Sequence, residues 1–210
     1  FTSLSIDLIY GTPGLTDAEW KNNLAQVAAL SVPHFSAYAL TVEDKTALHH
    51  AIVHKKAVPV DAGQAATQFE ILMEQAAAMG YEHYEISNLS LPGKHAIHNT
   101  NYWMGKPYSG IGPSAHSFDG QRRRWNVANN AVYVRSVQQE GMPSYEEETL
   151  TEVQHLNEYI MTSLRTMWGC DPDKIATEWN KDYEKVVEDA SAQFIDKGWI
   201  RRDGNKLILT

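Results

Sequence analysis

The stretch His95–Gly105, HAIHNTNYWMG, concentrates side chains that can bind a metal or stack on a flat ligand. It holds two histidines, two asparagines, a tyrosine and a tryptophan. Imidazole nitrogens bind transition metals and haem iron, and aromatic rings offer flat apolar faces to a ligand. Because the stretch follows neither the helical nor the strand period, we expect a loop whose side chains serve a ligand.

Four histidines, His83, His95, His98 and His116, raise the question of a zinc site. Their spacings match no standard zinc pattern, and the helical H-E-x-x-H arrangement is missing. A single histidine can still be an axial haem ligand, because that role needs no cluster. The spacing therefore argues against a dedicated zinc site and leaves haem ligation open.

The segment Gly110–Ser117, GIGPSAHS, has the glycine spacing of a dinucleotide-binding loop. No helix with apolar periodicity follows it, so it fails the structural context that a Rossmann motif requires. Its glycines would still let a ligand approach the backbone closely. His116 in this segment is either a structural histidine or a ligand contact.

Arg122–Trp125, RRRW, is the one concentrated positive patch in an acidic chain. A run of charges is usually a solvated edge. The alternative is that the guanidinium groups of Arg122, Arg123 and Arg124 bind carboxylates of a ligand, because their fork geometry matches a carboxylate.

The first part of the chain alternates between the strand and the helical period. Apolar strands are predicted at Ser5–Tyr10, His34–Leu40 and Tyr81–Ser87, with a helix after a capping box at Thr16–Glu19 and another that ends at Gly80. This order predicts a parallel sheet with crossover helices. Asp7 would then be a buried acid near the carboxyl end of its strand, where it either caps a loop or contacts a ligand.

From Asn88 to Gly141 the periodicity breaks, and we expect an ordered, ligand-facing loop region rich in aromatic residues. An acidic connector, SYEEETLTE, follows. Capping signals at Thr149–Glu152 and at Asp171 with Pro172 then predict helices, a third helix ends at Gly198, and two short strands flank an Asp-Gly turn. Three helices and a hairpin are typical of a winged-helix-like domain.

Composition limits the function classes. The chain has 210 residues, a net charge of −8 and a pI of about 5.6, which argues against coating nucleic acid because neutralising phosphates needs a basic surface. Cys170 is the single cysteine, so residues 1–210 contain no disulfide framework and no multi-cysteine cluster, and a cytoplasmic location is expected. The sequence has no apolar run long enough to span a membrane.

Five segments together resemble the HemW and HemN-type coproporphyrinogen dehydrogenase group of radical SAM proteins, and its HemW-like members most closely: SIDLIYGTPG, YEHYEISN, HNTNYW, GIGPSAHSF and RRRWNV. The resemblance implies an α/β fold. Residues 1–145 would form the C-terminal half of a partial (β/α)₆ radical SAM barrel, and residues 146–210 a small α+β winged-helix-like domain of the HemN type. We therefore expect the C-terminal portion of a longer protein, as the start FTSLSIDLIYG, which lacks Met, also indicates.

The resemblance also implies roles for individual residues. Asp7 and Ala39 would contact S-adenosylmethionine (SAM), and His116 would line the substrate or second SAM position. The motif HNxxYW, associated with haem in HemW-like proteins, falls on His98, Asn99, Tyr102 and Trp103, with His98 as the iron ligand. Two departures stand out: Leu15 replaces a usual glutamine, and the CxxxCxxC motif that holds the [4Fe-4S] cluster is absent from these residues.

Three functions remain for the intact protein. As a haem chaperone it would use His98 as axial ligand and Arg122–Arg124 for the propionates, with a haem-acceptor protein as partner. As an oxygen-independent coproporphyrinogen III oxidase it would convert propionates into vinyl groups. A winged-helix nucleic-acid binder is a third class, disfavoured by acidic residues in the would-be recognition helix. Without the cluster motif this chain alone should be inactive; dimerisation, and membrane association of the intact protein only, are further expectations.

Overall fold

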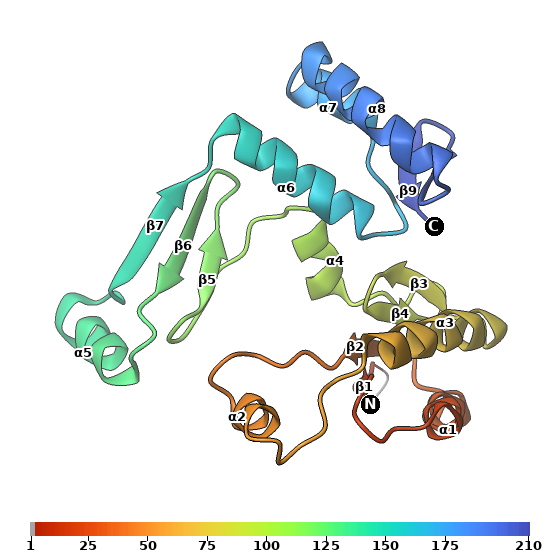
Figure 1. Cartoon of the computed structure of the whole chain (residues 1–210). Coiled ribbons are helices and arrows are strands. Elements are labelled where there is room, and N and C mark those ends of the chain that lie inside the picture. The colour runs from red at the N-terminus through yellow and green to blue at the C-terminus, as the bar shows by residue number, and fades with distance from the viewer. Residues whose placement is uncertain (1–2) are drawn as a thin grey trace. The chain divides into compact units, whose positions relative to one another are not determined.

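The computed structural model of the chain describes residues 3–210 and divides into two compact units (Figure 1). The N-terminal unit extends to Ala96, and the C-terminal unit comprises residues 97–210. Both mix helices and strands, which confirms an α/β chain. The domain boundary expected between residues 145 and 146 remains a prediction.

The N-terminal unit follows the predicted order of strands and helices. Its elements are β1 (Ser5–Tyr10), α1 (Asp17–Ala29), β2 (His34–Ala39), α2 (Ala47–Val53), α3 (Ala62–Ala78), β3 (Glu82–Glu85) and β4 (Asn88–Ser90). The capping box predicted at the start of α1 is present: Glu19 N donates to Thr16 Oγ1 (3.2 Å), and Thr16 N donates to Glu19 Oε2 (2.9 Å). Gly80 follows the end of α3, as expected, and has a φ of +78°.

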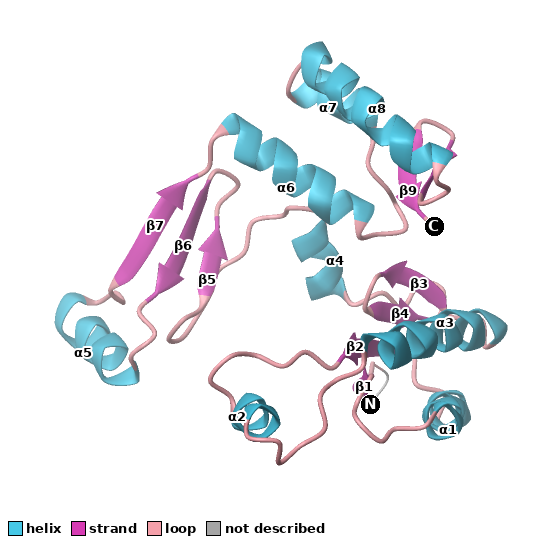
Figure 2. Cartoon of the chain, in the orientation of Figure 1, coloured by secondary structure: helices cyan, strands magenta, loops and turns pink. Residues whose placement is uncertain are grey.

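The sheet of this unit is only partly parallel. Its strand order is β1-β2-β4-β3, and β1 and β2 are parallel, with Asp7 opposite Ser36 and Tyr10 opposite Ala39. The expected third strand, β3, runs in the same direction as β1 and β2 but does not pair with β2. The chain turns after Glu85 and returns as β4, which lies between β2 and β3 and is antiparallel to both (Figure 2). Ser87 N donates to Glu85 Oε2 (3.1 Å) within this turn, a local side-chain bond that hydrophobic patterning does not register.

Helices α1 and α3 cover one face of the sheet and form the core with it (Figure 1). Gln68 of α3 is fully buried within this core. Its Oε1 accepts from Gly11 N (2.7 Å), its Nε2 donates to Leu15 O (2.9 Å), and its carbonyl accepts from Trp20 Nε1 (2.9 Å). Gln68 therefore ties the β1–α1 connection to α3. The main buried apolar residues are Trp20, Leu24, Val27, Phe35, Ala37, Ile71, Leu72, Ala76 and Leu89.

The C-terminal unit contains two sheets. The segment that was expected to be a loop region supplies α4 (Ile97–Trp103), β5 (His116–Phe118), β6 (Arg122–Asn126) and α5 (Asn130–Glu140), and it is followed by β7 (Tyr145–Thr149). Strands β5, β6 and β7 form an antiparallel sheet (Figure 2). The expected loop region and acidic connector are thus wrong in detail, because pairing between distant segments, rather than local apolar periodicity, makes these strands.

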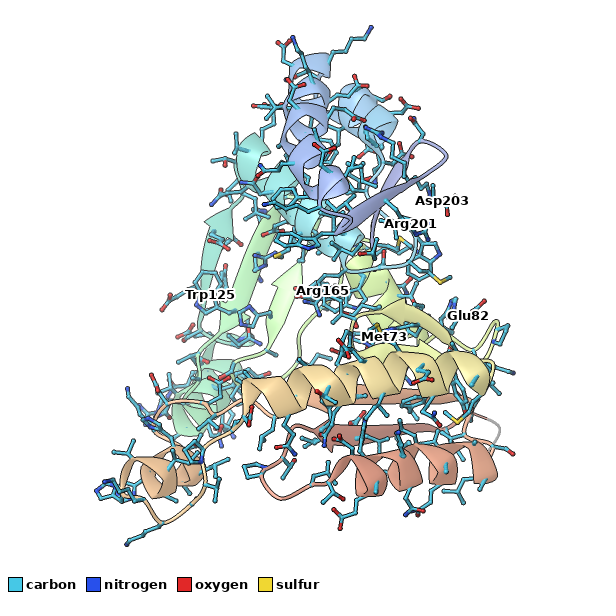
Figure 3. The ribbon with its side chains drawn as sticks, turned by 45° about the vertical axis from the view of Figure 1, so that its right-hand side comes forward. Met73, Glu82, Trp125, Arg165, Arg201 and Asp203 are labelled. Atoms are coloured by element: carbon cyan, nitrogen blue, oxygen red, sulfur yellow. The ribbon has the colours of Figure 1, made fainter. Side chains whose placement is uncertain are left out.

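The last part of the chain has the predicted three helices and hairpin: α6 (Glu152–Leu164), α7 (Pro172–Glu178), α8 (Lys181–Asp196), β8 (Ile200–Asp203) and β9 (Lys206–Leu209). Asp171 and Pro172 begin α7 as expected, and Figure 3 shows Arg201 and Asp203 on the hairpin. The capping box of α6 lies at Thr151 and Gln154, not at Thr149 and Glu152, because Thr149 belongs to β7.

Cys170 lies in the core of this last part, with Leu156, Ile175, Ile200 and Leu207. Its backbone exchanges two hydrogen bonds of 2.8 Å with Leu207, which attach the α6–α7 connection to the hairpin. Burial raises the pKa of the Cys170 thiol, so it is a structural rather than a reactive cysteine. No helix within residues 3–210 has the length and apolar character needed to cross a membrane.

Replacing Gln68 by alanine should lower the free energy of unfolding by about 2–3 kcal/mol, because it leaves the buried N–H of Gly11 without its acceptor. Urea denaturation followed by circular dichroism measures the loss. Gln26→Ala, at an exposed position of α1, is the matched control and should change stability by less than about 0.5 kcal/mol. Equal losses in the two variants would contradict the role of Gln68.

Candidate functional site

The motif His98-Asn99-x-x-Tyr102-Trp103 lies on a helix, not on the loop that we expected. Backbone bonds from Met104 N to Thr100 O (2.9 Å) and from Lys106 N to Asn101 O (3.0 Å) close its last turn, and Gly105, with a φ of +66°, follows. The helix was missed because polar and aromatic side chains occupy most of its positions. Residues four apart share a helix face, so His98 and Tyr102 project together.

A cavity of about 730 Å³ lies in the C-terminal unit between α4, the three-stranded sheet and α6. This volume is in the range of small-molecule and cofactor sites. The cavity brings together His98, Tyr102, Trp103, His116 and Arg123, five of the residues singled out in the sequence. Glu158, Met161 and Thr162 of α6, which the sequence analysis did not single out, complete its wall.

Aromatic rings form a continuous lining of this cavity. The centroid of Tyr102 lies 5.1 Å from that of Trp103 and 5.5 Å from that of Tyr108, and Tyr108 lies 6.2 Å from Phe118. Burial raises the pKa of Tyr108, so its hydroxyl stays protonated at neutral pH. Such a lining favours a flat, largely apolar ligand.

Trp103 carries a buried hydrogen-bond donor that no described residue satisfies. Its Nε1 atom is buried and has no hydrogen-bond partner within the described part of the chain. The guanidinium carbon of Arg165 lies 4.8 Å from the centroid of the Trp103 ring, a cation–π contact that holds the ring in place. Buried donors normally have a partner, so Trp103 Nε1 is an exception among the described residues.

The three arginines of β6 alternate between the two faces of the sheet. Arg123 lines the cavity, and its Nη1 and Nη2 each lie 2.9 Å from a carboxylate oxygen of Glu158. Arg122 and Arg124 line a separate hollow of about 540 Å³, in which Arg122 Nε lies 2.9 Å from Asp119 Oδ2 and Arg124 Nη2 lies 3.3 Å from Glu147 Oε2. The structure therefore brings one of the three predicted arginines to His98.

Asp119 marks the turn between β5 and β6. Hydrogen bonds from the backbone N–H groups of Arg122 and Gln121 lower the pKa of Asp119 to about 2. The tight turn fixes where β6 begins and so which arginine faces the cavity.

His116 lies at the start of β5 and lines the cavity from the sheet side. Its ring stacks on Trp125, with centroids 6.1 Å apart, and Figure 3 shows Trp125 on the same sheet. We expected the glycines of this segment to admit a ligand. Gly110 instead admits the backbone of His116, because a Cβ at Gly110 would lie 2.1 Å from the carbonyl oxygen of His116.

The SAM residues inferred from the resemblance lie in the N-terminal unit. Asp7 is exposed in the middle of β1, so the expectation of a buried acid is wrong: β1 is an edge strand, and α1 and α3 cover its other face. Ala39 is also exposed, at the end of β2. Strand alternation points the side chains of Asp7 and Ala39 to opposite faces, so only the backbone at Ala39 could serve a ligand beside Asp7.

The sheet face that carries Asp7 holds a buried polar network. His34 Nδ1 lies 2.7 Å from Ser5 Oγ, and His34 Nε2 lies 2.7 Å from Tyr84 Oη. Ser36 Oγ donates to Asn88 Oδ1 (3.2 Å) on the same face. Burial lowers the pKa of His34; the Asp7 carboxylate acts in the opposite direction, and His95 lowers the pKa further. The sequence carried a signal for this network, because His34, Ser36 and Tyr38 alternate with apolar residues along β2.

His95, the other histidine of the opening stretch, is not part of the cavity. Its Nε2 lies 2.9 Å from Glu82 Oε2 in the N-terminal unit. Among residues 3–210 no three histidine, cysteine or acidic side chains are grouped so that they could hold a metal ion.

No family model matches the chain. Among curated proteins, the heme chaperone HemW of Bacillus subtilis is 27% identical over all of this chain and 55% of its own length. HemW of Mycobacterium tuberculosis is 30% identical over all of this chain and 52% of its own length. The solved structure of Escherichia coli coproporphyrinogen III oxidase (HemN), described as a radical SAM enzyme, matches all of this chain and 52% of its own, with a TM-score of 0.77 at 20% identity.

Over its whole length this chain is similar to HemW proteins. It spans about half the length of the curated HemW proteins that it matches over its whole length. The HemN structure has the same fold over the matched half. The resemblance drawn from the five sequence segments is thereby confirmed.

The polar network around His34 predicts a pH dependence of stability. Because burial lowers the pKa of His34 from its ordinary 6.5, the unfolded chain binds the proton first as the pH falls. The stability contributed by neutral His34 is therefore fully present above about pH 6.5 and is lost as the pH falls through the lower folded-state pKa. Denaturation near pH 7.5 and near pH 5.5 should show a larger loss for the wild type than for His34→Gln.

His50→Gln, at an exposed position of α2, is the control and should keep the wild-type pH dependence. Parallel pH profiles for the wild type and His34→Gln would show that His34 does not titrate with folding.

Proposed function

We propose that this chain binds an iron tetrapyrrole in the cavity of its C-terminal unit, as part of a HemW-like haem chaperone. The observation that carries the proposal is the cavity itself, which puts His98 beside an aromatic lining and the guanidinium of Arg123. The HemW relatives are named heme chaperones, and their similarity covers the whole chain.

The residues of the cavity fit a haem group. His98 is exposed at the wall, so its imidazole can turn toward an iron, and one imidazole is sufficient for axial ligation. Tyr102 and Tyr108 offer flat faces, and Trp103 Nε1 is a buried donor without an acceptor among the described residues. Arg123, which lines the cavity, would be the arginine that meets a propionate. The bound haem would supply the iron; the chain supplies the ligand, the apolar walls and the charge.

The same proposal includes the barrel, the C-terminal domain, the SAM site and the iron–sulfur cluster. We infer that the parallel β1–β2 pair, with α1 and α3 on its outer face, is part of the barrel wall, and that residues 146–210 are the HemN-type C-terminal domain. Asp7, with the backbone at Ala39, would contact SAM on the polar sheet face. The thiolates of the [4Fe-4S] cluster would come from outside this chain, whose single cysteine is buried and structural.

A second function, oxygen-independent coproporphyrinogen III oxidation, is supported by the match to the HemN fold. Its substrate carries no iron, so His98 would not act as an axial ligand. Nothing in the comparisons supports the nucleic-acid alternative, and Glu188 of the acidic helix α8 is paired with Arg202.

Replacing His98 by alanine should weaken ferric haem binding about tenfold or more and remove the Soret shift of a histidine-ligated haem, because the imidazole nitrogen is the proposed ligand. Optical titration of haem into residues 1–210 and into the full-length protein measures both changes. The control is His50→Ala, because His50 lies on α2 of the N-terminal unit and is not among the residues that line the cavity. An unchanged spectrum and affinity in His98→Ala would remove His98 as the ligand.

An assay of the full-length protein distinguishes the haem chaperone from the coproporphyrinogen III oxidase. As a chaperone it should bind haem without consuming coproporphyrinogen III under anaerobic, reducing conditions with SAM. Vinyl-bearing product in that assay, detected by chromatography, would favour the oxidase instead.

A further inference from the structure

Arg123 already holds a carboxylate of the chain, and that carboxylate lies in the cavity wall. The contact is bidentate: Arg123 Nη1 to Glu158 Oε1 and Arg123 Nη2 to Glu158 Oε2 both measure 2.9 Å. Two parallel hydrogen bonds between a guanidinium and a carboxylate are the strongest form of this pair. The edge of the guanidinium formed by Nη1 and Nη2 is therefore occupied by Glu158.

The pair is accessible from the cavity. The side chain of Arg123 is 28% exposed and that of Glu158 is 32% exposed, so neither is sealed in the core. Both line the cavity that contains His98, and Arg123 lies 5.8 Å from the centroid of Phe118 in the aromatic lining. A ligand in this cavity would lie against the pair.

The charges around Arg123 favour replacement of Glu158 by a ligand carboxylate over binding of that carboxylate beside Glu158. Glu148 Oε1 lies 3.6 Å from Arg123 Nη1, so two acids already surround one guanidinium. A further carboxylate brought to Arg123 would face like charges, which is unfavourable in a partly desolvated site. Binding of an anionic ligand group to Arg123 is therefore coupled to the departure of Glu158.

The side chain of Glu158 can leave Arg123 without a movement of helix α6. It lies on the exposed-to-half-buried side of α6, and its backbone carbonyl accepts from Thr162 Oγ1 (2.8 Å), so the helix position is held independently of the side chain. Rotation of the Glu158 side chain frees the guanidinium without any change in the helix.

We propose that Glu158 is a specificity-determining residue that stands in for a ligand carboxylate, and that a carboxylate of the bound tetrapyrrole displaces it from Arg123. This rests on the proposed function, because it requires a tetrapyrrole in the cavity. Glu158 keeps Arg123 oriented in the absence of ligand. It weakens the binding of a ligand whose carboxylate must replace it at Arg123, and it does not weaken the binding of a ligand without a carboxylate. The cavity then distinguishes a carboxylated tetrapyrrole from its ester.

The test compares two metal-free probes, deuteroporphyrin IX and its dimethyl ester, so that ligation by His98 plays no part. Quenching of tryptophan fluorescence in residues 1–210 reports binding. Glu158→Gln should bind the dicarboxylate about 2- to 5-fold more tightly than the wild type, the range for release of one partly exposed charge pair, and the diester with less than about a 1.5-fold change. Arg123→Gln should weaken the dicarboxylate by a similar factor and leave the diester unchanged.

Glu152→Gln is the matched control, because it removes the same charge from the same helix at an exposed position outside the cavity. Equal effects of Glu158→Gln on the two probes, or no effect on either, would overturn the inference and indicate that the pair only braces β6 against α6. The ¹⁵Nε resonance of Arg123 in the wild type gives an answer even if Glu158→Gln fails to fold: it should shift with the dicarboxylate but not with the diester, and an identical response to both overturns the inference.

Failure of the proposed function has a different signature. In that case neither porphyrin binds the wild type, and ferric haem titration is the same for the wild type and His98→Ala. If both porphyrins bind and only the carboxylate dependence is missing, the cavity remains a tetrapyrrole site and the role of Glu158 alone is lost.

Discussion

The charge pairing between β6 and β7 is the interaction on which the cavity depends. In the register of these strands Arg123 faces Glu148, Arg124 faces Glu147 and Trp125 faces Glu146. Cross-strand pairs of opposite charge stabilise an antiparallel sheet, and like charges in the same places would destabilise it. The two charged segments Arg122–Asn126 and Tyr145–Thr149 therefore become strands because they pair with each other.

This register also assigns each side chain to a face. Arg124 lies over the ring of Tyr145, 3.8 Å from its centroid, on the face that also carries Arg122. Arg123 and Trp125 point to the other face, where Arg123 meets Glu158 of α6. A slip by one residue would exchange the faces and remove the guanidinium from the cavity. The Asp119 turn, which fixes the start of β6, is therefore part of the site although it does not touch the cavity that contains His98.

Both units bury polar groups at positions where a protein without a ligand would usually bury apolar side chains. The sheet of the N-terminal unit buries His34, Ser36 and Asn88 on the face opposite its helices, at the expense of a simpler apolar core. In the C-terminal unit, the Nε1 of Trp103, whose ring packs edge-on against Tyr102, is buried without a partner among the described residues. Buried polar groups are costly unless they are satisfied, so such surfaces are expected where a fold serves a ligand.

The sequence alone determined the strand–helix order of the first part, the caps at Thr16 and Asp171, the C-terminal helices and hairpin, and the resemblance to HemW proteins, because these depend on local spacing and motif residues. It did not determine that the motif around His98 is a helix, that Asp7 is exposed, or that the segment after Glu85 returns as an antiparallel strand. Those features depend on partners distant in sequence. Only the tertiary structure selected Arg123 from three adjacent arginines and paired it with Glu158, because strand register and helix packing, not residue type, decide which side chains share a cavity.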